Sequence, residues 1–146
     1  MNAIVAAHRQ LLRVLVSTAV IALAGCAGME GNNSTQVTLS GAQEVPPVTT
    51  AASGFGTITI GADKSVTGSV TTSGIAGVAA HIHEGAPGKN GPVIVPMNKT
   101  SDNSWSFAPG AKFTDAQFDA YKAGNTYVNV HSVANKGGEI RGQLKP

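Results

Sequence analysis

Short runs in which apolar and polar residues alternate, separated by glycine-rich turns, restrict this chain to a fold built from strands. Residues 54–60 read Gly-Phe-Gly-Thr-Ile-Thr-Ile, and this alternation places Ile58 and Ile60 on one face of a strand. Residues 61–64 form a turn, and residues 65–72 alternate again, which predicts a hairpin. Further strand-like runs cover residues 37–39, 78–83, 92–97, 104–107, 125–132 and 139–144. We therefore predict an all-β fold, an antiparallel, Greek-key-like β-sandwich.

One segment departs from this pattern and predicts a single short helix. Thr114 and Gln117 are spaced as the two partners of a capping box, in which each side chain bonds the backbone of the other. Phe113 and Phe118 occupy the positions of a hydrophobic staple, and Gly124 suits the left-handed residue after a helix. The expected helix has about two to three turns.

Histidine is concentrated in the strands and suggests a metal site. Beyond residue 25 the chain has three histidines, His81, His83 and His131. Residues i and i+2 of a strand point to the same face, so the first two imidazoles leave the backbone together. Neutral imidazole binds copper, zinc and iron, and three such ligands leave a coordination position open. The alternative is that these are structural histidines that hydrogen-bond neighbouring strands.

The last two strand-like runs, 125–132 and 139–144, favour an antiparallel hairpin. A loop centred near Asn135 predicts three cross-strand pairs: Tyr127 with Gln143, Asn129 with Arg141, and His131 with Glu139. In that position Glu139 serves either as a fourth ligand or as the acceptor that orients His131. Arg141 attracts anions to the site. The alternative for both charged residues is an ion pair or a hydrogen-bond network on the sheet surface.

The N-terminal segment predicts export and a lipid anchor. Residues 1–25 combine basic residues with an apolar core too short to span a bilayer, which is typical of a signal peptide. They end in Leu23-Ala24-Gly25-Cys26, which resembles the bacterial lipobox, where the cysteine is lipidated. The alternative is an ordinary signal peptide with a chance cysteine. Residues 26–36 are small and polar and predict a flexible tether, so the folded domain is expected at 37–146.

Localisation and partners follow from this organisation. We expect a cell-envelope protein held to the membrane through the lipid on Cys26. The outer membrane is favoured, because Ala27 is not the aspartate that retains some lipoproteins at the inner membrane. Removal of Arg9 and Arg13 with the signal leaves 10 − 2 = 8 basic against 8 acidic residues. A neutral domain gives no support for nucleic-acid binding. The sequence does not identify a protein partner.

Three long motifs resemble those of one family. They are Leu39-Ser-Gly-Ala-Gln-Glu-Val-Pro-Pro47, Ala80-His-Ile-His-Glu-Gly-Ala-Pro-Gly88, and Tyr127-Val-Asn-Val-His-Ser132 followed by Gly137-Gly-Glu-Ile-Arg-Gly-Gln-Leu144. In this order they resemble the CHRD domain, first named in chordin and common in secreted bacterial proteins. The resemblance covers residues 37–144. In chordin the domains belong to a protein that binds growth factors, so the resemblance implies no particular reaction.

A second, looser resemblance concerns the histidines. His81-Ile-His83 is similar to the copper-binding His-x-His of Cu/Zn superoxide dismutases, which are also antiparallel β-sandwiches. By this resemblance His131 corresponds to a later histidine ligand and Arg141 to the arginine that steers superoxide. The disulfide cysteines and the zinc-bridging residues of those enzymes are missing, so a mononuclear site is implied. We expect transition-metal binding with copper favoured over zinc or iron, and superoxide dismutase-like redox activity. The alternative is a non-catalytic protein-interaction or adhesion module.

Overall fold

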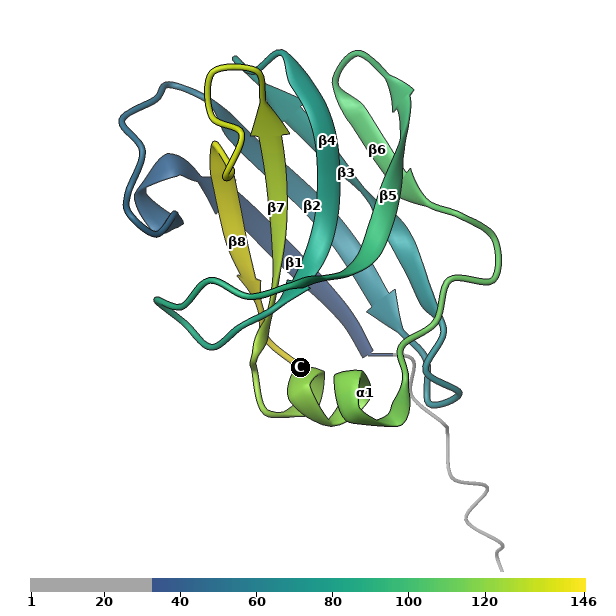
Figure 1. Ribbon diagram of the computed structural model, residues 1–146. Coiled ribbons are helices and arrows are strands. Elements are labelled where there is room, and N and C mark those ends of the chain that lie inside the picture. The colour runs from purple at the N-terminus through teal and green to yellow at the C-terminus, as the bar shows by residue number, and fades with distance from the viewer. Residues whose placement is uncertain (1–32) are drawn as a thin grey trace, which may run out of the picture.

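Each strand in the described part of the chain pairs with two neighbours, so the sheet closes on itself (Figure 1). The computed structural model describes residues 33–146. The strands follow the order β1-β2-β3-β6-β5-β4-β7-β8, and β8 pairs with β1. All of these pairs are antiparallel. The strands are β1 (Asn33–Ser40), β2 (Ser53–Ile60), β3 (Val66–Ser73), β4 (Gly77–Glu84), β5 (Val93–Ser101), β6 (Ser104–Phe107), β7 (Thr126–Ser132) and β8 (Ile140–Leu144).

The expected sandwich is therefore corrected to a closed barrel of antiparallel strands. A sandwich needs two sheets with free edges, whereas here β6 joins β3 to β5 and the pair Ser40–Arg141 joins β1 to β8. Alternation along a strand is the same in both architectures, because each has one buried face. The pairing of the strands distinguishes a sandwich from a barrel. The alternation of residues along the sequence does not show which strands pair.

The domain begins earlier than expected. Strand β1 starts at Asn33, so residues 33–36, placed in the tether by the sequence, pair with β2. The signal peptide at 1–25, Cys26 and residues 26–32 of the tether lie outside the described residues. Among those that are described, no helix is long and apolar enough to cross a membrane.

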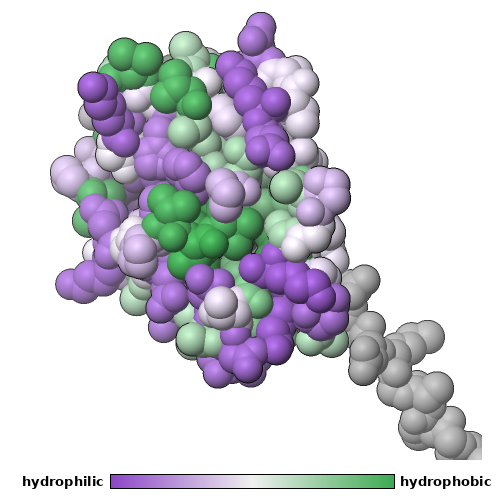
Figure 2. Space-filling view, turned by 45° about the vertical axis from the view of Figure 1, so that its right-hand side comes forward, coloured by the Kyte–Doolittle hydropathy of each residue, from purple (hydrophilic) through white to green (hydrophobic). Residues whose placement is uncertain are grey.

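The barrel interior holds the apolar half of each alternating strand. Its core includes Leu39, Ile58, Val70, Ile82, Val95, Met97, Trp105, Val128, Val130, Ile140 and Leu144. Helix α1 (Asp115–Lys122) lies at one end of the barrel (Figure 1) and has the predicted capping box between Thr114 and Gln117. Tyr121 of α1 is buried beside Phe113 and Phe118. In the face shown in Figure 2, hydrophilic side chains surround a hydrophobic patch.

The outer face of β4, β7 and β8 is also buried, and this matters for the site. A connection from the 3-10 helix η1 (Gly41–Gln43) to β2 folds over β8, and Glu44 on it accepts a hydrogen bond from Asn129 of β7. The connection from β4 to β5, residues 85–92, passes across β7 and β8 (Figure 1). Outward-facing polar side chains of these strands are therefore shielded from water; they are His83, Asn129, His131 and Arg141.

Candidate metal centre

Strands β4 and β7 lie side by side and bring the three histidines together. In the register of the pair, His83 is opposite Tyr127, His81 is opposite Asn129, and His131 is opposite Ala79. His81 and His131 are therefore diagonal neighbours on the outer face. One nitrogen from each of the three histidines lies within 4.8 Å of the others. The C-terminal hairpin thus places His131 where the sequence analysis expected it.

Backbone carbonyls fix the ring orientation of two of these histidines. His83 donates its Nδ1–H to the carbonyl oxygen of Gly91 over 3.0 Å, and His131 donates its Nδ1–H to that of Lys136, also over 3.0 Å. A carbonyl oxygen only accepts, so in both neutral rings the proton is on Nδ1 and the lone pair is on Nε2. Metal-binding histidines are commonly oriented in this way.

The ring nitrogens that do not contact these carbonyls lie close to one another. The distance between His81 Nδ1 and His131 Nε2 is 3.2 Å, which in the metal-free chain is a hydrogen bond donated by His81. Two nitrogens bound to one tetrahedral ion at about 2.0–2.1 Å lie about 3.4 Å apart. The Nε2 atom of His83 is buried and has no hydrogen-bond partner among the described residues. An unpaired buried acceptor costs about 1–3 kcal/mol, and coordination of an ion satisfies it.

The surroundings of His81 and His83 favour the neutral form of the imidazole, which is the form that binds metals. Burial, followed by the nearby rings of His131 and His83, lowers the pKa of His81 to about 4. Burial also lowers the pKa of His83, and the charge of Arg141 acts in the same direction. Both rings are therefore neutral at pH 7. Metal ions and protons compete for the same lone pairs, and at pH 7 the proton is a weak competitor at His81 and His83.

One side of the cluster opens to solvent through a hollow of about 410 Å³. We call this hollow the histidine opening; it is lined by Val78, Ala79, His81, His131, Ser132, Val133 and Lys136. A shift of register between Gly77 and Ala79 turns Val78 outward, where it is 57% exposed. A ligand that fills a fourth coordination position reaches the cluster from this side. Lys136, an exposed residue, also lines this opening.

Glu139 does not join the cluster. Its Oε1 atom accepts a hydrogen bond from Thr50 over 2.8 Å, and the residues that could hold an ion within 33–146 include only the three histidines. The Ser132 side chain, and after it Thr50, lower the pKa of Glu139. The Lys136 carbonyl has taken the orienting position beside His131 that the sequence suggested for Glu139. Backbone carbonyls leave no residue signature, so neither Lys136 nor Gly91 was expected here.

Arg141 also lies away from the histidine opening. Its side chain is only 2% exposed, and its guanidinium carbon lies 3.5 Å from the centre of the Tyr127 ring. The Tyr127 ring in turn stacks on His83 at 4.9 Å with an angle of 11° between the planes. Tyr127 therefore separates the guanidinium from the histidines. The sequence analysis predicted the pairing of Tyr127 with Gln143 but assigned Tyr127 no part in the site.

The comparisons with known proteins place this chain in a family. A family model of the CHRD domain matches residues 35–144, which is most of the chain. The chain belongs to the CHRD family. This confirms the expectation from the three sequence motifs, and the fold shows why they occur together in this CHRD domain. Residues 39–47, 80–88 and 127–144 meet at the outer face of β4, β7 and β8. No curated protein and no solved structure matches the chain.

Proposed function

We propose that this CHRD domain binds one transition-metal ion through His81, His83 and His131. The observation that carries the proposal is the convergence of three ring nitrogens within 4.8 Å, two of them turned inward by backbone carbonyls. The orphaned Nε2 of His83 supports it, because a buried lone pair without a donor is costly unless something binds it. A purely structural role leaves that atom unexplained.

Copper is the favoured ion, with zinc and iron as alternatives. The donor set consists of imidazole nitrogens alone, which suits all three metals, and copper binds such a site most tightly of the divalent series. The histidine opening leaves room for a further ligand. Lys136 is one of the residues that line it, and we expect its positive charge to attract small anions. These two features favour superoxide dismutase-like redox activity as the finer proposal. A non-catalytic protein-interaction or adhesion module is the competing function.

The metal test uses the chain without a histidine tag. After loading with Cu²⁺ or Zn²⁺ and dialysis against a weak chelator, elemental analysis should find one ion per chain. The His81→Ala and His131→Ala variants should lose the ion. Lys136→Ala should keep it, because the carbonyl that orients His131 belongs to the backbone and is still present in alanine. Retention below one ion per chain that is the same in all four proteins would reject the metal site and leave the interaction module.

A superoxide-consumption assay tests the finer proposal on the copper-loaded protein. Turnover should exceed that of the same amount of free copper in buffer. It should fall with rising ionic strength, because screening weakens the attraction of an anion to Lys136. Lys136→Ala should reduce the rate without loss of copper. A rate no higher than that of free copper would leave a metal-binding protein without this activity.

We further propose that the domain is held at the outer membrane, in the cell envelope, by a lipid on Cys26. The support is the sequence Leu23-Ala24-Gly25-Cys26 at the end of an apolar segment. Growth with radiolabelled palmitate should label the protein, and Cys26→Ser should abolish the label. Fractionation of the two membranes then tests the location. An unlabelled wild-type protein would contradict the anchor without bearing on the metal.

A further inference from the structure

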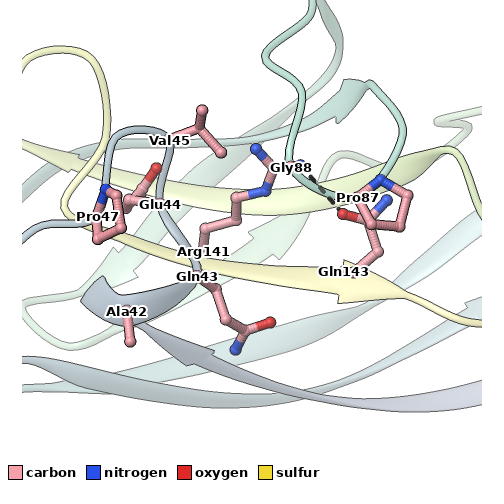
Figure 3. A pocket seen from close by; sticks show the side chains of 9 residues that line it. All are labelled: Ala42, Gln43, Glu44, Val45, Pro47, Pro87, Gly88, Arg141 and Gln143. Carbon is pink, nitrogen blue, oxygen red and sulfur yellow. Dashed lines mark hydrogen bonds between the residues drawn. The ribbon is translucent and has the colours of Figure 1, made fainter.

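A second hollow, of about 470 Å³, is lined by Arg141, the residue whose guanidinium stacks on the Tyr127 ring. Figure 3 shows its lining residues. It is formed where the connection after η1 faces the connection between β4 and β5. We call it the arginine hollow; it is lined by Ala42, Gln43, Glu44, Val45, Pro47, Pro87, Gly88, Arg141 and Gln143. The guanidinium lies between the Glu44–Pro47 wall and the Pro87–Gly88 wall. None of these residues belongs to the histidine cluster.

The Arg141 guanidinium has no ion-pair partner within residues 33–146. Its described acceptors are Gln143 Oε1 at 3.1 Å, the Ala86 carbonyl at 3.3 Å and Asn90 Oδ1 at 3.4 Å. A charged donor and a carboxylate normally approach to about 2.7–2.9 Å, so these are long contacts to neutral atoms. A guanidinium has five N–H donors, so its hydrogen-bonding capacity is only partly used. A buried cation held this way can accept a better anionic partner.

The surroundings of Arg141 are rigid and already shaped. Its guanidinium stacks on Tyr127, which fixes the plane in which the N–H groups point. Gln143 donates from Nε2 to the carbonyl oxygens of Gly85 and Gly124 at 2.9 and 2.8 Å, so its Oε1 stays toward Arg141. The orientation of the guanidinium is therefore set before a ligand binds, which lowers the entropic cost of binding.

Charge and shape restrict what fits. Glu44 lines the same hollow and is 5% exposed, although its Oε1 accepts from Asn129 and does not pair with Arg141. Burial raises the pKa of Glu44. When it is ionised, its negative charge partly offsets that of Arg141 and repels a doubly charged anion such as phosphate more strongly than a singly charged one. Val45, Pro47 and Pro87 give the hollow apolar walls. These features match a singly charged, planar anion attached to a short hydrocarbon chain.

We propose that the arginine hollow binds a small organic carboxylate, with Arg141 as the anchor. The two carboxylate oxygens accept from the guanidinium, and the hydrocarbon part contacts the Val45, Pro47 and Pro87 walls. This site is distinct from the metal centre and does not depend on it. The experiment on carboxylate binding can therefore fail or succeed independently of the metal-binding experiment.

Butyrate is a suitable probe, because it joins one carboxylate to a short apolar chain. The full chain, kept metal-free with a chelator, is titrated with butyrate while its backbone and arginine Nε–H resonances are followed by NMR. Saturable shifts are expected at Arg141, Gly88 and Gln143. Butyramide, which has the same shape without the charge, and inorganic phosphate should bind at least about tenfold more weakly. Shifts that do not saturate, or that are equal for butyrate and butyramide, would overturn the proposal.

Variants make the test specific to the hollow. Pro87→Asp adds a negative charge on an exposed loop that lines it, and should weaken butyrate binding about tenfold. Pro109→Asp makes the same change on an exposed turn outside the hollow and should have no effect. Arg141→Lys keeps the charge without the two-pronged geometry and should also weaken binding. If Arg141→Lys does not fold, the comparison of Pro87→Asp with Pro109→Asp still tests the proposal. Equal butyrate affinity in these two variants would reject the site.

Discussion

The Nδ1 atom of His81 lies 3.2 Å from the Nε2 atom of His131, although 50 residues separate the two in the sequence. Their contact exists because β4 and β7 pair in a register that sets His131 opposite Ala79, two residues before His81. Any change that moves this register, or that turns one ring, alters the metal centre. The first prediction addresses the ring of the third histidine.

Gly91→Ala should weaken metal binding without removing a ligand. A Cβ at this position would lie 1.6 Å from the Glu84 carbonyl oxygen, so the backbone has to move. The Gly91 carbonyl that orients His83 would move with it. Loss of such an orienting group typically costs about 10–100-fold in metal affinity. Competition titration with a chromophoric chelator measures the change.

Gly137→Ala is the matched control for that variant. It lies next to the other orienting carbonyl, of Lys136, but its added Cβ meets no atom within 4 Å. Its metal affinity should equal that of the wild-type chain. If both glycine variants bound metal as tightly as the wild type, the carbonyl of Gly91 would have no part in the site.

The metal-free chain should lose stability in mild acid. The folded-state pKa of His81 is about 4, below its ordinary value of 6.5. Between these values the unfolded chain binds more protons, so the free energy of unfolding falls as the pH drops from about 6.5 towards 4 and is unaffected above that window. Urea denaturation at a series of pH values measures it.

A His81→Gln variant gives the contribution of this residue to the pH dependence. Because glutamine does not titrate, its free energy of unfolding should fall less between pH 6.5 and pH 4 than that of the wild-type chain. His83, whose pKa is also lowered by burial, should account for part of the remainder. Identical pH profiles for the two proteins would contradict the environment described for His81.

Ile82→Ala should destabilise the barrel by about 2–5 kcal/mol, because it leaves a cavity in the core. Ile82 has no exposed surface and lies between the two histidines on the opposite face of β4. Chemical denaturation of the metal-free protein measures the loss. The control is Val78→Ala on the same strand, where the side chain is 57% exposed and the change should stay within about 0.5 kcal/mol. Equal losses would mean that Ile82 does not face the core.

Thr114→Ala should lower the free energy of unfolding by about 1 kcal/mol. The Thr114 hydroxyl accepts a hydrogen bond from the Gln117 backbone N–H at 3.3 Å, and alanine leaves that donor without its cap. Thr114→Ser keeps the hydroxyl and should be close to wild type, so the pair separates the cap from any effect of side-chain size. The metal affinity of both variants should be unchanged, because Thr114 and the helix contribute no ligand to the histidine cluster.

Local features of the fold were readable from the sequence because they depend on neighbours along the chain. The hairpin of β2 and β3, the capping box of α1 and the pairs Tyr127–Gln143 and Asn129–Arg141 were all expected and are confirmed. Each follows from a period of two along a strand, from a turn or from a fixed helical spacing. The third pair, His131–Glu139, lies beyond the start of β8 at Ile140. The side chain of Glu139 contacts Thr50 instead.

The sequence by itself determined the family, the all-β character and the three histidines on outward strand positions. Only the tertiary structure decided that the sheet closes into a barrel, because closure depends on the pairings of β6 with β3 and of β8 with β1. It also decided that Gly91 and Lys136 orient the histidines and that Arg141 lies behind Tyr127 in a separate hollow. The two orienting contacts depend on the paths of the loops that follow β4 and β7, and they use backbone carbonyls. A backbone carbonyl is present in every residue, so the sequence does not show which one will orient a histidine. Alternation and spacing, in contrast, depend on residue types that the sequence shows directly.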